Sequence, residues 1–78
     1  MRYFFHLRES GGIVLDEEGR ELPDLAAVEA AARTNARSVI AGEALNGKLP
    51  LAAVIEVDDE QGRRVLDLPF RDAVILDG

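Results

Sequence analysis

Few side chains of this sequence have the chemistry of a catalyst. Ser10, Thr34 and Ser38 carry the aliphatic hydroxyl groups, and His6 is the one histidine. A nucleophilic hydroxyl must lie within hydrogen-bond reach of its base and beside donors that stabilise the oxyanion. Ser10 is expected in a turn, several residues beyond His6 along a strand, and no nucleophile elbow is present. The sequence therefore predicts no catalytic residue, and we expect the chain not to be an enzyme.

Two acidic runs, Asp16–Glu18 and Asp58–Glu60, are the candidates for a metal site. A calcium loop spaces its oxygen ligands over twelve residues with a glycine at the sixth, and neither run fits that pattern. Cysteine is absent, which excludes thiolate zinc sites and disulfides. The pair Gly11-Gly12 lacks the lysine of a phosphate-binding loop. We interpret both runs as solvated turn carboxylates and expect no metal and no cofactor.

The net charge argues against nucleic acid as a partner. The 78 residues carry a formal charge of −6, from 15 acidic and 9 basic side chains. A surface of this sign repels phosphate backbones. Arg2, Phe4, His6 and Arg8 come closest to the aromatic and basic stripe on which single-stranded bases stack, but the stripe is small.

The candidate residues must be positioned by a hairpin at the start of the chain. Residues 2–8 alternate as in a strand, with Tyr3, Phe5 and Leu7 on one face. Glycines in the turn at residues 9–12 permit a tight reversal, and residues 13–15 return as a second strand. Residues 16–19 and 59–62 both read as turns that end in a glycine with a positive φ angle.

A long helix should follow this hairpin. Leu22-Pro23-Asp24 has the features of a helix start, because proline is tolerated in the first turn and Asp24 can cap it. The alanine-rich segment 25–45 then favours helix, and Asn46-Gly47 is a typical stop. One apolar stripe runs along it, formed by Leu25, Val28, Ala32, Ala36, Val39 and Ile40.

A second hairpin completes the predicted fold. Residues 53–58 and 64–68 alternate as strands around the turn at 59–62, and Pro69 ends the return strand. Residues 70–76 fit either a short helical turn or an extended end. The sequence thus predicts one α+β domain over residues 1–78, with one long helix on an antiparallel sheet of about four strands in two layers.

Several of these segments together resemble a known bacterial family. They are the opening Met1–His6, the turn Asp16–Gly19, the helix start Leu22–Asp24, and the closing Leu68–Phe70 with Ala73-Val74. In combination they are similar to family 6894 among the domains of unknown function. That resemblance implies a small bacterial α/β-type protein and supplies no activity or catalytic residue. A fainter analogy links the hairpin and alanine-rich helix to HicB-like antitoxins.

The sheet face turned away from the helix is the predicted interface. Apolar and charged side chains alternate there, and Val14 is one of the apolar ones. His6 could pair with Glu56 if the first and third strands are neighbours. A domain of this size gains burial by self-association, so we expect a homodimer through this face or through a strand edge. The interface candidates are Arg2, Phe4, His6, Arg8, Val54, Glu56, Val65 and Asp67.

These features lead to an expected function and location. We expect a small non-enzymatic interaction or regulatory module; the alternative is an antitoxin-like or nucleic-acid-associated regulator that acts as an oligomer. The sequence shows neither a secretory signal nor an apolar stretch of about 20 residues that could span a bilayer. We therefore expect a cytoplasmic protein.

Overall fold

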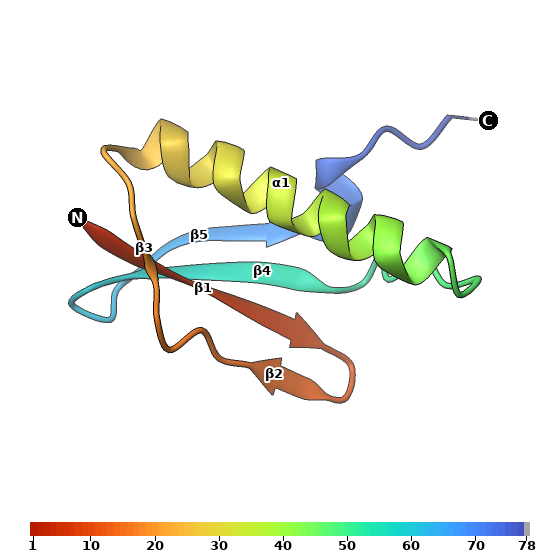
Figure 1. The fold of residues 1–78 in the computed structure, drawn as a ribbon, viewed down its shortest axis with the longest axis horizontal. Helices are drawn as coiled ribbons and strands as arrows, with labels where there is room; N and C mark the ends of the chain where they lie inside the picture. The colour runs from red at the N-terminus through yellow and green to blue at the C-terminus, as the bar shows by residue number, and fades with distance from the viewer. Residues whose placement is uncertain (78) are drawn as a thin grey trace.

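The computed structural model describes residues 1–77 and confirms the α+β prediction. One helix lies across one face of an antiparallel sheet (Figure 1). The sheet has five strands, where the sequence predicted about four. The elements are β1 (Arg2–Glu9), β2 (Gly12–Val14), β3 (Arg20–Glu21), α1 (Leu25–Ala44), β4 (Val54–Asp59), β5 (Arg64–Pro69) and the 3-10 helix η1 (Phe70–Ala73).

The strand β1 lies inside the sheet and organises it. The order across the sheet is β2-β1-β4-β5, and β3 pairs with the start of β1 beyond the end of β2. Phe5 lies opposite Val57 and Leu7 opposite Ile55, so the helix-facing residues predicted for β1 and β4 share one face. The sequence did not predict β3, because its two residues, Arg20 and Glu21, are both charged and too few to show a hydrophobic alternation.

Asp16 holds the edge of the sheet together where β2 has ended and β3 has not begun. Its Oδ2 accepts a hydrogen bond from the Phe5 backbone N–H at 3.0 Å, in the place of a neighbouring strand. Its Oδ1 accepts from the N–H groups of Glu18 and Gly19, both at 3.1 Å. The predicted turn at residues 16–19 is therefore a loop held to β1 by a carboxylate.

The helix α1 begins and ends where its local signals predict. Asp24 has an extended backbone, and its Oδ1 accepts from the Ala27 N–H at 2.8 Å, which caps the first turn. After the last turn, the Lys48 N–H donates to the Glu43 carbonyl at 3.0 Å. Within residues 1–77, no helix combines the length and the apolar character needed to cross a membrane.

The core lies between α1 and the β4–β5 half of the sheet. Phe70 is its largest fully buried side chain, and η1, which carries it, packs against α1. The sequence left residues 70–76 open between a helical turn and an extended end. The structure has a 3-10 helix over Phe70–Ala73. Among residues 1–77, the only fully buried aromatic side chain therefore lies in the segment with the weakest sequence pattern.

The helix covers the sheet unevenly. Its main contacts are with β4, β5 and η1, and β2 is not among them. Phe5 and Leu7 are consequently only partly buried at the border of the core. Leu25, predicted in the apolar stripe, is exposed, whereas Ala31 is buried instead. Small alanines on α1 allow a close approach to β4 and β5 but do not extend over β1 and β2.

Candidate functional site

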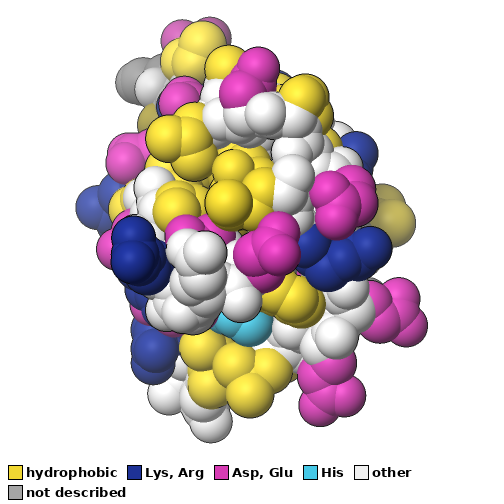
Figure 2. Space-filling view, turned by 90° about the vertical axis from the view of Figure 1, so that its left-hand side faces the viewer, with side chains coloured by type: hydrophobic (Ala, Val, Ile, Leu, Met, Phe, Trp, Pro, Cys, Tyr) yellow, Lys and Arg dark blue, Asp and Glu magenta, His cyan; other side chains and the backbone are white. Residues whose placement is uncertain are grey.

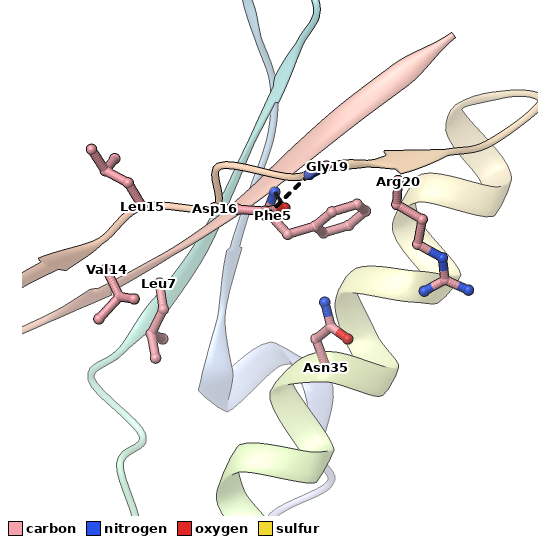
Figure 3. A pocket seen from close by; sticks show the side chains of 8 residues that line it. All are labelled: Phe5, Leu7, Val14, Leu15, Asp16, Gly19, Arg20 and Asn35. Carbon is pink, nitrogen blue, oxygen red and sulfur yellow. Dashed lines mark hydrogen bonds between the residues drawn. The ribbon is translucent and has the colours of Figure 1, made fainter.

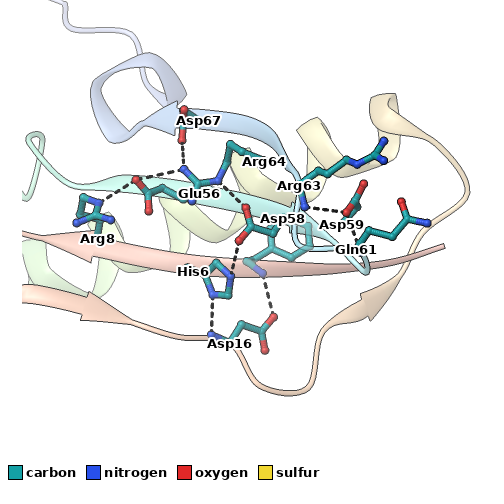
Figure 4. A network of polar contacts seen from close by, with 11 residues as sticks. His6, Arg8, Asp16, Glu56, Asp58, Asp59, Gln61, Arg63, Arg64 and Asp67 are labelled. Atoms are coloured by element: carbon teal, nitrogen blue, oxygen red, sulfur yellow. Dashed lines mark hydrogen bonds and ion pairs between the residues drawn. The ribbon is translucent and has the colours of Figure 1, made fainter.

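The predicted interface residues lie mostly on the sheet face away from α1, which we call the outer face. Three neighbouring strands, β1, β4 and β5, supply charged side chains that form one connected network (Figure 4). The network residues are His6, Arg8, Asp16, Glu56, Asp58, Arg64 and Asp67. Four of these seven are among the predicted interface residues, and Asp16, Asp58 and Arg64 are not.

Glu56 is the centre of the outer face and is only 8% exposed. Its Oε2 accepts from Arg8 Nε at 2.8 Å and lies 3.5 Å from an Arg64 nitrogen. The hydrogen bond from Arg8 is the main cause that lowers the pKa of this carboxyl, and it outweighs the opposing effect of burial. Its Oε1 is buried and accepts no hydrogen bond from the described residues.

Arg64 connects the acidic residues of β4 and β5. Its Nε donates to Asp58 Oδ1 at 2.6 Å, and its terminal nitrogen donates to Asp67 Oδ1 at 2.9 Å. The three acidic groups Glu56, Asp58 and Asp67 therefore share this guanidinium, and Arg8 binds Glu56 from the other side. Two arginines face three carboxylates in this network, so its charge does not favour an approaching phosphate.

His6 is held at both ring nitrogens. Its Nδ1 accepts from the Asp16 backbone N–H at 3.0 Å, and its Nε2 lies 3.3 Å from Asp58 Oδ2. His6 and Glu56 are cross-strand neighbours, as predicted for adjacent first and third strands. The predicted contact between their side chains is wrong, however. Glu56 is bound by Arg8 and Arg64, and the imidazole of His6 contacts Asp58 instead.

Phe4 is less available on the outer face than the sequence suggested. It is partly buried, and its ring lies against the backbone of Gly19. A Cβ atom at Gly19 would stand 2.8 Å from Phe4 Cε1, which is closer than van der Waals contact allows. Gly19 also has φ 73°, so the loop depends on glycine for both its backbone angle and its packing.

Two valines depart from the predicted interface. Val14 pairs with Leu7 and shares the helix-side face, so its predicted place on the outer face is wrong; Ile13, opposite Arg8, takes that place. Val65 is the extra residue of a β-bulge, because Val57 pairs with Leu66 and the next pair is Asp58 with Arg64. The bulge packs Val65 partly against the core.

The acidic run at the β4–β5 turn is also more than a solvated cluster. Asp59 is buried, and its Oδ1 accepts from the N–H groups of Gln61 and Arg63 at 2.9 and 3.0 Å. Glu60 accepts from the Arg2 N–H at 2.9 Å. Asp59 therefore closes the turn, and Glu60 joins the turn to the start of β1. No group of three acidic or histidine side chains among residues 1–77 is arranged to hold a metal ion.

A groove lies on the helix side of the sheet, between β1, β2 and α1, with a volume of about 410 Å³ (Figure 3). Phe5, Leu7 and Val14 line its sheet wall, and Asn35 of α1 faces them. Leu15 lies at its rim and points to the other side of the chain (Figure 3). The sequence missed this groove because the alternation of Ile13 to Leu15 gives no information on how far a helix reaches.

Apolar surface continues from the groove along the flank of α1. Leu22, Ala27, Ala30 and Ala31 line a second shallow depression beside Arg20. Seen from the side that carries the N-terminus and β3, hydrophobic side chains gather in the middle of the molecule with charged side chains around them (Figure 2). The helix side of the β1–β2 half therefore carries uncovered apolar surface, whereas the outer face over β1, β4 and β5 carries the charged network.

Comparison with known proteins adds a family and no activity. No curated protein and no solved structure matches the chain. One family model matches residues 2–71, which is nearly all of the sequence and includes every strand. The chain therefore belongs to the family described as Domain of unknown function (DUF6894).

Proposed function

We propose that the protein is a non-enzymatic interaction module that acts as a homodimer. The observation that carries this proposal is the exposed apolar run Ile13–Leu15 at the end of the edge strand β2, next to a groove whose sheet wall is apolar. Val14 and Leu15 are 62% and 61% exposed, and Ile13 is 40% exposed. Contiguous apolar surface of this kind on a small soluble domain marks a place where another protein binds.

The surface area of the chain supports association. The described molecule exposes 5209 Å². A folded monomer of 8.5 kDa is expected to expose about 4,700 Å². The exposed side chains that contribute to this area include Val14 and Leu15 at β2 as well as Ile75 and Leu76 after η1.

The state of the candidate catalytic groups also supports a binding role. His6, the base that a nucleophile would need, already has a hydrogen-bond donor at Nδ1 and a carboxylate at Nε2. Arg8 and Arg64 neutralise acidic side chains of the same face. The polar network therefore stabilises the sheet. The residues that would gain from burial by a partner are the exposed apolar ones at Ile13–Leu15.

Sedimentation equilibrium of the intact chain, over a concentration series from about 1 to 100 µM, tests the proposal. A homodimer gives a mass of twice 8.5 kDa at the upper end and a concentration-dependent average below it. A mass of 8.5 kDa at every concentration would overturn the proposed function.

A further inference from the structure

Resting on the proposed homodimer, we infer that two copies join through β2, antiparallel to its own copy about a two-fold axis, into one continuous sheet. β2 is an outer strand of the sheet and pairs only with β1 among the described residues. Its other edge therefore presents backbone N–H and C=O groups that a further strand can pair with. An antiparallel strand pair is self-complementary, which a two-fold axis requires.

The opposite edge of the sheet is protected against such pairing. β5 has a β-bulge at Val65, and it ends at Pro69, which has no N–H to donate. It also carries the charged residues Arg64 and Asp67. Bulges, prolines, charges and very short strands are features by which natural edge strands avoid other strands. β2 is short, with three residues, but it has no bulge, proline or charge, so β5 is the better protected edge.

The distribution of charge favours β2 over the outer face as the surface that meets its own copy at the two-fold axis. In a two-fold contact, residues near the axis meet their own copies, and like charges placed opposite each other are destabilising. The outer face has Glu56, Arg64 and Asp58 at its centre. Residues 10–15 are uncharged, so β2 brings no like charges together.

The groove beside β2 gives the second copy apolar surface to cover. Val14 projects on the helix side next to Leu7, while Ile13 and Leu15 are on the other side of the strand. A copied β2 would continue the sheet past its present edge and place its own Val14 beside the groove wall of the first copy. Both faces of the junction would then bury aliphatic side chains that are exposed in the single chain.

Single cysteines provide the test, because the chain has none of its own and any disulfide must join two copies. Directly opposed residues of an antiparallel pair have Cα atoms about 4.5–5.5 Å apart, which is within the range of a disulfide. We expect at least one of Ile13→Cys, Val14→Cys and Leu15→Cys to form a covalent dimer rapidly under mild oxidation. Asp67→Cys on β5 and Leu45→Cys at the exposed end of α1 are matched controls and should remain reduced.

The outcomes separate this inference from the proposed function. A dimer by sedimentation, with cross-linking confined to residues 13–15, supports both. A dimer that cross-links only through Asp67→Cys or Leu45→Cys, or through none of the five positions, overturns the β2 junction and leaves the homodimer standing. A monomer at all concentrations overturns both proposals. It does so even if β2 pairs with a strand from a different protein.

Discussion

The β4–β5 half and the β1–β2 half of the sheet differ in how completely other elements cover their side chains. At β4–β5, α1 and η1 cover one face, and the outer face is closed by paired charges. At β1–β2, the helix does not reach, and Phe5, Leu7 and Val14 border an open groove. The comparison shows that a cluster of charged side chains does not by itself identify a binding surface, because the charged groups can form ion pairs with one another. The half that lacks covering elements has more to gain from a partner.

The largest expected difference between the two halves lies in their aromatic residues. Phe70→Ala removes a side chain that is 0% exposed in the covered half and should cost about 3–5 kcal/mol, enough to unfold much of so small a domain. Phe5→Ala acts on a partly buried side chain at the groove and should cost clearly less. Circular dichroism with urea titration measures both. Equal losses would show that the β1–β2 half is packed as fully as the other.

Two glycines with nearly the same φ angle sharpen the comparison. Gly62 has φ 79° and open space around it, so Gly62→Ala should cost about 1 kcal/mol for the backbone alone. Gly19→Ala adds a clash with the Phe4 ring at 2.8 Å and should cost roughly 2–3 kcal/mol.

The same urea titrations measure these two changes. In a Phe4→Ala background, the extra cost of Gly19→Ala should decrease, because the ring is gone and only the close contact with Arg2 Cγ at 2.9 Å remains. If the extra cost is unchanged there, the clash with Phe4 does not contribute to it.

The acidic residues of the network make the stability depend on pH. Arg8 lowers the pKa of Glu56 below its ordinary value of 4.5. Burial opposes ionisation of Asp16, but hydrogen bonds from three backbone N–H groups outweigh it and lower its pKa below 3.8. A group whose pKa is lower in the folded chain stabilises it fully above the unfolded value. That stability is lost as the pH falls through the folded value.

We therefore expect the urea concentration at the unfolding midpoint to be lower at about pH 3 than at neutral pH. The double variant Glu56→Gln with Asp16→Asn should show a smaller difference between the two pH values. At neutral pH, Glu56→Gln should cost roughly 1–3 kcal/mol, because two arginines lose a charged acceptor. A double variant with the same pH dependence as the native chain would show that other carboxylates control acid unfolding.

The smallest effect is expected at Glu17, beside Asp16 in the loop of the β1–β2 half. Glu17 is exposed, and Glu17→Gln should leave the free energy of unfolding within about 0.5 kcal/mol. Asp16→Asn serves as the contrast, since it changes a carboxylate that holds β1. A large loss at Glu17 would point to a bound ion or partner at this loop.

Local patterns in the sequence predicted most of the fold. The alternation of Tyr3, Phe5 and Leu7 identified the inner face, and Asp24 identified the helix start. The predictions that were wrong concerned how the elements are arranged relative to one another. The bulge that turns Val65 inward, the register that puts Val14 beside Leu7, and the reach of α1 leave no mark in a single segment. Phe70 was missed as core because it lies in a one-turn helix after a proline, where no periodicity can develop.

The candidate surface was harder to predict for the same reason. The sequence grouped charged and apolar residues of the outer face by alternation alone, and it could not show that Arg8 and Arg64 would be occupied by Glu56, Asp58 and Asp67. The exposed edge β2 follows from strand order, which only the assembled sheet reveals.

The measurement that tests the account most directly compares one lysine at each side of the sheet by sedimentation. Val14→Lys should raise the dimer dissociation constant at least about thirtyfold, the effect of losing a central interface side chain, without unfolding the chain, because Val14 is largely exposed. Asp67→Lys alters the outer face and the β5 edge equally strongly and should leave the dimer intact. A dimer that survives Val14→Lys and dissociates with Asp67→Lys would contradict the account.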